Sequence, residues 1–236
     1  IENNADKITI SDCRFENINS DAVYINDCKN TVVKNSRFHN LRRGIVAKNP
    51  KHTTENMKNV ISNNLFSHIG WGEVQNAAII SNDNGAQIKN NTIYDLPGNA
   101  ICYQGNDLEI MHNEIYDVCR EADDSAAIYT GRRYLDRGSV IKNNYIHDII
   151  PQYGWNSERD FGGESFRWGF GVYLDDAVCG QTVSNNIFYN IVSAFCVNSG
   201  QFNTCTNNII VNTKCEGFKV TSYESGSQKR IDRVRE

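Results

Sequence analysis

A short phrase recurs along the chain at a period of 22 or 23 residues, with longer intervals where extra residues intrude. Each copy holds two apolar residues five positions apart around a central pair that is most often Asn-Asn, as in Ile141-Lys142-Asn143-Asn144-Tyr145-Ile146. The copies begin at Ile10, Val33, Ile61, Ile88, Ile110, Ile141, Val183 and Cys205. A repeat of this length is typical of a solenoid, in which successive coils stack on one another.

The five-residue spacing places a corner inside each copy. Side chains alternate along a strand, so two residues five apart cannot share one face of it. Asparagine suits a corner because it tolerates left-handed backbone angles. Stacking would also align six asparagines in a column whose amides bond from coil to coil. These are Asn64, Asn91, Asn113, Asn144, Asn186 and Asn208.

A second segment recurs in every copy, with a small residue, a large apolar residue and then a variable residue. Ala127-Ile128-Tyr129 and Gly171-Val172-Tyr173 are examples. The large residue would face the interior and the variable residue the outside. Together the pattern predicts an all-β, single-stranded right-handed parallel β-helix of about eight coils with an asparagine ladder. We expect it to span 1–222, with 223–236 as a C-terminal cap or tail.

Composition narrows the class of protein. The chain has 236 residues and a net charge of −4, which suits one domain and disfavours a nucleic-acid partner. No apolar run is long enough for a membrane span. Eight cysteines lack metal-site spacing, so we interpret them as small buried residues, or as disulfides if the protein is exported. The start inside a repeat suggests a missing N-terminal segment or additional domains.

Insertions that break the repeat period indicate which part of the rod carries functional residues. Three of them, Gly70–Asn76, Cys119–Ser125 and Ile150–Phe170, leave the corner before the second segment. Two others, Lys48–Asn59 and Arg132–Gly138, leave its opposite end. Together they would wall a groove over the outward face of these strands.

The groove has the composition of a sugar platform. A pyranose ring offers an apolar face and a rim of hydroxyls, which aromatic and amide side chains can bind. Tyr129, Tyr173 and Gln104 would lie on the floor, and the long insertion adds Glu164 and Trp168. The aromatic residues of that insertion could equally pin it to the rod.

Acidic residues cluster at two neighbouring coils beside the largest insertion. Hydrolysis of a glycosidic bond needs two carboxyl groups, and Asp124, Asp175 and Asp176 are our catalytic candidates. A straight extrapolation separates Asp124 from Asp175 by roughly 20 Å along the strand direction. Either the Cys119–Ser125 loop therefore curls back over the groove, or Asp124 works with an acid of the long insertion.

Two basic residues accompany these acids. Strand alignment puts Arg132 level with Asp176, so it would neutralise the acids across adjacent coils or bind an acidic sugar. His147 should point outward beside a corner, as a base or, in the interpretation we favour, as a partner of a neighbouring acid.

Four phrases resemble the core of bacterial right-handed β-helix carbohydrate-active proteins, a group that includes glycoside hydrolases of the α-L-fucosidase and xylanase type. They are His112–Val118, Asp124–Arg132, Asn144–Ile149 and Val172–Asp176. The resemblance covers about residues 110–208. It implies a polysaccharide hydrolase with two catalytic aspartates, matched here by Asp124 and one of Asp175 or Asp176. The chain departs from the group at 198–203, where relatives carry a Gly-Gly-Arg-Asp-Asn turn.

Three functions follow as hypotheses. The leading one is a glycoside hydrolase acting on a polysaccharide or oligosaccharide, in a secreted or periplasmic setting, without a cofactor. The second is a polysaccharide lyase or uronate epimerase, which clustered arginines and a calcium ion among the acids would favour. The third is a non-catalytic carbohydrate-binding or adhesive rod that grips glycan in the same groove.

Overall fold

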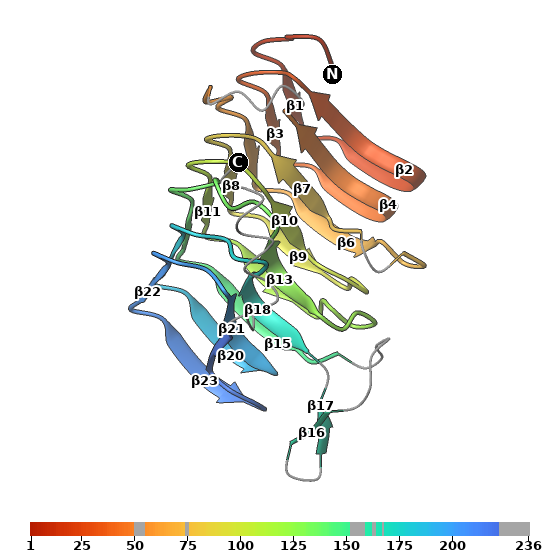
Figure 1. The fold of residues 1–236 in the computed structure, drawn as a ribbon. Helices are drawn as coiled ribbons and strands as arrows, with labels where there is room; N and C mark the ends of the chain where they lie inside the picture. The colour runs from red at the N-terminus through yellow and green to blue at the C-terminus, as the bar shows by residue number, and fades with distance from the viewer. Residues whose placement is uncertain (50–54, 74–75, 152–158, 162–163, 167, 222–236) are drawn as a thin grey trace.

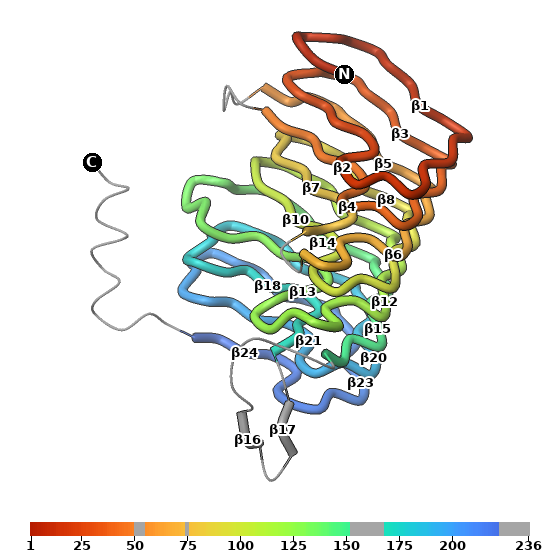
Figure 2. Tube along the Cα trace, turned by 90° about the vertical axis from the view of Figure 1, so that its right-hand side faces the viewer, coloured from red at the N-terminus to blue at the C-terminus, as the bar shows by residue number. Residues whose placement is uncertain are grey.

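The computed structural model describes residues 1–49, 55–73, 76–151, 159–161, 164–166 and 168–221. Within these residues the regular secondary structure consists of β-strands alone, and the chain winds as a solenoid (Figure 1). Figure 2 shows the coils as a stack of open loops. The expected all-β class and parallel strand pairing are confirmed. The expected tail, 223–236, lies outside the described residues.

One side of the solenoid is an eight-stranded parallel sheet to which each repeat contributes three residues, the one before its phrase and the first two of the phrase. Its central residue, such as Ile61 or Ile141, is buried. In spatial order the strands are β1 (Thr9–Ser11), β3 (Val32–Lys34), β5 (Val60–Ser62), β8 (Gln87–Lys89), β11 (Glu109–Met111), β14 (Val140–Lys142), β19 (Thr182–Ser184) and β22 (Thr204–Thr206).

The remaining sides form one larger sheet that turns a corner. The long strands β2 (Arg14–Asn26) and β4 (Arg37–Lys48) run through that corner and pair with each other. One branch from β4 holds β6 (Leu65–Ile69), β9 (Thr92–Tyr94), β12 (Glu114–Tyr116), β15 (Tyr145–Ile149), β20 (Ile187–Ile191) and β23 (Ile209–Thr213). The other holds β7 (Ile79–Asn82), β10 (Ile101–Tyr103), β13 (Ser125–Thr130), β18 (Gly169–Leu174), β21 (Ser193–Asn198) and β24 (Phe218–Thr221).

Part of the long insertion forms a separate hairpin. Strands β16 (Arg159–Phe161) and β17 (Glu164–Phe166) pair antiparallel between β15 and β18 in the sequence. The other described strand pairs are parallel.

Like residues stack on like inside the rod. Phe38 lies between Phe15 and Phe66, with ring centroids 4.8 and 4.6 Å apart. The corner between the branches uses small residues because space is short there: a Cβ on Gly171 would lie 2.6 Å from the carbonyl oxygen of Ala194. The repeat of small and large apolar residues therefore reflects one packing arrangement repeated in successive coils.

The central asparagine pair divides into two roles. Its first member takes the left-handed backbone that turns the corner, with φ 54° at Asn63 and 56° at Asn143. Its second member is buried and bonds along the stack. The Nδ2 of Asn144 donates to Oδ1 of Asn186 (3.0 Å) and to the carbonyl of Ile110 (3.0 Å). Asn64, Asn91, Asn113, Asn144, Asn186 and Asn208 are linked in series in this way.

The cysteines are all free thiols in the structure. Cys28, Cys119 and Cys196 are buried, and burial raises the pKa of Cys119 to about 12. The interpretation as small buried residues fits these three. It is wrong for Cys13, which is exposed, and the other four cysteines are only partly buried.

One buried acid predicts a pH-dependent stability. Asp83 is 1% exposed, and burial raises its pKa to about 6 although Asn59 donates to it at 2.9 Å. Because the folded state holds this proton more tightly than the unfolded state, its contribution to stability is present below pH 4 and is lost as pH rises through 6. We expect Asp83→Asn to raise the free energy of unfolding by about 1 to 3 kcal/mol at pH 7.5 and to change it little at pH 4. Urea unfolding at both pH values checks this, and equal effects at the two would contradict it.

Candidate active site

A pocket of about 340 Å³ opens on the outward face of β7, β10 and β13. The loop before β13 and the turn after β18 complete its walls. The lining residues are Ile80, Asn82, Asn99, Cys102, Tyr103, Gln104, Ala122, Asp123, Asp124, Ser125, Tyr129, Gly131, Arg132 and Asp175. Of the predicted site residues, Asp124, Asp175, Tyr129, Arg132 and Gln104 therefore lie on one pocket.

The extrapolated separation of roughly 20 Å between Asp124 and Asp175 is wrong as a guide to the site, because it assumed a straight strand. Residues 122–124 line the same pocket as the strand residues, so the loop before β13 curls back over the groove. Left-handed backbones at Cys119 (φ 59°) and Asp124 (φ 58°) make these turns. Pairing between β13 and β18 also skips Ala127 and Gly171, at the small-residue corner.

Asp124 lies in an environment that favours its protonated form. Burial of the carboxyl raises its pKa, and the negative charge of Asp175 raises it further, whereas hydrogen bonding to Tyr173 acts in the opposite direction. The residue as a whole remains exposed, so the carboxyl is accessible from the pocket. A carboxyl that has a raised pKa and faces a pocket is suited to the role of a general acid.

Asp175 is held by several donors. Its Oδ2 accepts from the Tyr129 hydroxyl at 2.8 Å, and its Oδ1 accepts from Nδ2 of Asn198 at 2.8 Å and from the backbone N–H of Asp176 at 2.7 Å. Burial and the charge of Asp175 raise the pKa of Tyr129, so the phenol remains a donor. Donors to a carboxylate stabilise its charged form and fix its orientation.

Gly131 permits this close approach. A Cβ at this position would lie 2.7 Å from the Tyr129 hydroxyl oxygen and 3.3 Å from the Asp175 Cβ. The glycine after β13 therefore leaves room for the tyrosine and the aspartate of the next coil to meet.

Asp176 is not among the residues that line the pocket. Its Oδ2 accepts from Nε of Arg132 at 2.9 Å, so the predicted pairing across adjacent coils is confirmed. The Arg132 side chain is 82% exposed and lines the pocket rim. Arg132 thus connects the rim to the turn that carries both aspartates.

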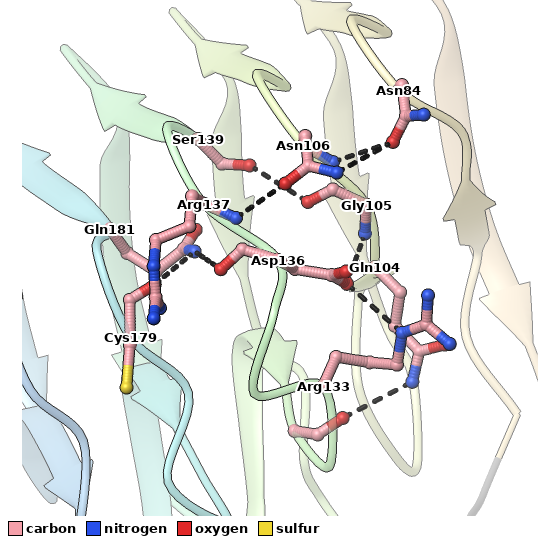
Figure 3. Close-up of polar contacts among 11 residues, drawn as sticks. Asn84, Gln104, Gly105, Asn106, Arg133, Asp136, Arg137, Ser139, Cys179 and Gln181 are labelled. Carbon is pink, nitrogen blue, oxygen red and sulfur yellow. Dashed lines mark hydrogen bonds and ion pairs between the residues drawn. The ribbon is translucent and has the colours of Figure 1, made fainter. Parts of the chain in front are cut away.

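A polar network holds the loop that follows β13 (Figure 3). The buried Oδ2 of Asp136 accepts from the backbone N–H of Gly105 at 2.6 Å and from Nε of Arg133 at 3.3 Å. Nearby, Nε2 of Gln104 donates to the carbonyl of Gly131 at 3.3 Å. The pocket rim is therefore attached to β10 by side chains as well as by the sheet.

The other predicted site residues lie elsewhere. Tyr173 is buried beside Tyr129 on the neighbouring strand and interacts with both Asp124 and Asp175. Trp168 flanks it, with its backbone N–H 2.9 Å from Oδ1 of Asp123. His147 lies on β15, in the other branch of the sheet, where Nδ1 is 2.7 Å from Oδ2 of Asp148. Glu164 belongs to β17, and its side chain lies outside the described part of the structure.

Asn198 and the amide of Asn99 were not predicted from the sequence. Asn198 holds Asp175, and Asn99 lines the pocket. Asn198 could have been found from the repeat, because it follows Val197 as Asp175 follows Leu174, the register partner of Val197. It lies at the start of 198–203, the segment in which the chain departs from the resembling proteins.

The described residues contain no group of three or more His, Cys, Asp or Glu side chains arranged to hold a metal ion. Over the same ranges, no helix has the length and hydropathy needed to cross a bilayer.

Comparison with known proteins places the fold. A solved structure named "Glycoside hydrolase" superposes with a TM-score of 0.68 at 19% identity, over 88% of this chain and 37% of that one. Two structures of PfbA, a surface adhesin of Streptococcus pneumoniae, give TM-scores of 0.57 and 0.54 at 14% and 15% identity. They cover 92% and 90% of this chain, and 67% and 62% of theirs.

The chain thus spans little more than a third of the hydrolase, and at these identities the likeness shows the fold alone. Among curated proteins, no sequence matches significantly. The family model described as "Right handed beta helix region" matches residues 1–77 and 76–231, nearly the whole chain. The chain belongs to the right-handed β-helix family.

Proposed function

We propose that this protein is a glycoside hydrolase in which Asp124 is the general acid and Asp175 is the catalytic carboxylate. One observation carries the proposal: two carboxyl groups from neighbouring coils line a single pocket in contrasting environments. Glycosidic hydrolysis needs one carboxyl that donates a proton and one that is ionised.

The assigned roles follow from the contacts. Asp124, whose pKa is raised by burial and by the charge of Asp175, would protonate the leaving oxygen. Asp175, which accepts from three donors, would activate water or attack the anomeric carbon. Tyr173 interacts with both and would act as a positioning residue between them.

The remaining lining suits a sugar. Asn82, Asn99 and Gln104 supply amides, and Tyr129 supplies a ring beside them. Amides bond hydroxyls, and a tyrosine ring can pack against the apolar face of a pyranose. Arg132 would contact the sugar at the rim while it keeps its ion pair with Asp176. Work on polysaccharide would fit a secreted or periplasmic setting, and the proposed reaction needs no cofactor.

Two other functions give different results in one assay. A lyase would leave an unsaturated product that absorbs in the ultraviolet, and a non-catalytic carbohydrate-binding rod would leave the glycan intact. Incubation with a panel of polysaccharides, followed by assay of reducing ends and of ultraviolet absorbance, separates them. We expect new reducing ends without absorbance, and absorbance or an unchanged glycan would reject hydrolysis.

The Tyr129 hydroxyl predicts a graded loss of activity. Tyr129→Phe removes one donor to Asp175 and keeps the ring, so we expect kcat/KM to fall about 10-fold to 100-fold, as for loss of a hydrogen bond to a charged group. Steady-state kinetics on the hydrolysed glycan checks this. An unchanged kcat/KM would remove Tyr129 from the positioning of Asp175.

The two carboxyls also predict a coupled titration. Replacing Asp175 by asparagine removes a negative charge that raises the pKa of Asp124, so that pKa should fall. Carbon-13 NMR of labelled aspartates over a pH series measures it without any substrate. If the Asp124 resonance titrates identically in both proteins, the two groups are not coupled in solution.

A further inference from the structure

The outward side chains of the sheet branch that carries the pocket form one row across the coils. Strand register places Tyr129 beside Cys102 on one side and beside Tyr173 on the other. The full row is Tyr24, Val46, Ile80, Cys102, Tyr129, Tyr173, Cys196 and Lys219. A long glycan that lay along this face would have to contact the whole row of side chains.

The middle of this row is open and the positions on either side of it are closed, although Tyr24 and Lys219 at the two ends are partly exposed. Ile80, Cys102 and Tyr129 are partly exposed and line the pocket. On the C-terminal side Tyr173 is 4% exposed and Cys196 is 3% exposed. The row is also closed on the N-terminal side, where Val46 is 1% exposed. The accessible part therefore covers three strands, roughly 10 to 15 Å of the solenoid axis.

The closure on the C-terminal side is built from aromatic residues. Phe170, Tyr173 and Cys196 form a small apolar cluster with Trp168 packed on it. Trp168 is tied to the pocket loop through Asp123, and Nζ of Lys219 lies 4.0 Å from its ring centroid. These contacts place a fixed wall beside Asp124 and Asp175.

We infer that the pocket takes the end of a glycan chain, or a one-sugar branch, rather than an internal stretch of chain. This inference rests on the proposed function and names its mode of attack. A volume of about 340 Å³ is at the lower end of the range for ligand pockets, about 300 to 1,000 Å³. A chain that crossed the acids would have to displace Trp168 on one side or cross the closed position at Val46 on the other.

Calorimetric binding to the Asp124→Asn variant tests the inference without turnover. The probes are L-fucose, and xylose, glucose and galactose oligomers of one to six units. We expect affinity for at least one series to reach its limit by the second unit, with less than a twofold gain to the sixth. Affinity that keeps rising to the fifth or sixth unit, by tenfold or more, would overturn it. Absence of binding to every probe would also overturn it.

The result stays separate from the test of hydrolysis. Length-independent binding by a wild-type protein that cuts nothing would reject the proposed function and keep a pocket for glycan ends. If the wild type cuts, release of single terminal sugars is expected, and a spread of internal fragments would contradict the inference.

A change in the wall sharpens the test. Trp168→Ala should lengthen the accessible row, so affinity for the five- and six-unit oligomers should rise at least threefold relative to the dimer. Trp71→Ala is the matched control, because Trp71 stacks on His68 away from this pocket and should leave the length dependence unchanged. Equal length dependence in both variants would remove Trp168 as the wall.

Discussion

Replacing Asp124 or Asp175 by asparagine is expected to lower kcat on the hydrolysed glycan by about 10²-fold to 10⁴-fold. The first change removes the proton donor, and the second removes the carboxylate that Tyr129 and Asn198 hold in place. Asparagine keeps the size of each side chain, so the melting temperature should stay close to that of the wild type. Reducing-end assays and thermal unfolding of the same samples measure both quantities.

Asp117→Asn is the control for this pair. Asp117 comes from the coil of Asp124 but lies after β12 and pairs with Arg120, away from the pocket. Its backbone is left-handed (φ 50°), which asparagine tolerates. We expect full activity. Retention of wild-type kcat by Asp124→Asn or Asp175→Asn would refute the assignment of that residue.

The second large effect is on stability. Asn144→Ala should lower the free energy of unfolding by about 1 to 3 kcal/mol. The Asn144 Oδ1 accepts from the backbone N–H and the Nδ2 of Asn113, and its Nδ2 donates to Asn186 and to the carbonyl of Ile110. All of these groups are buried, so truncation leaves donors and acceptors without partners and without water. Urea unfolding monitored by circular dichroism measures the change.

Asn143→Gly distinguishes the stability contributed by the buried asparagine stack from that contributed by the corner residue. Asn143 is the exposed neighbour, and its left-handed backbone suits glycine. We expect a change within about 0.5 kcal/mol, typical of an exposed site. If both variants unfold like the wild type, the buried amide column contributes little to stability.

The repeat carried most of the information about the fold. Each coil repeats the packing of the one before, so Phe38 between Phe15 and Phe66 appears in the sequence as a fixed spacing. The odd interval between Ile141 and Ile146 required a corner, and the left-handed Asn143 is at that corner. Such patterns predict the fold well because each of them recurs in several coils.

The site was only partly predictable because it lies where the repeat is broken. Tyr129, Gln104 and Asp175 are strand-face positions, and register alone places them on one face. Asp124 belongs to a loop, and the spacing of the strands does not determine the path of that loop. His147 shows the converse: its outward position was predicted, but it lies on the other branch of the sheet from the pocket.

The most direct test of the central claim compares single and double variants of the two aspartates. If Asp124 and Asp175 form one catalytic pair, either change alone removes most of the catalysis. The double variant Asp124→Asn/Asp175→Asn should then be about as slow as the slower single variant. Losses that multiply in the double variant, each single change acting independently of the other, would contradict a shared catalytic unit in this pocket.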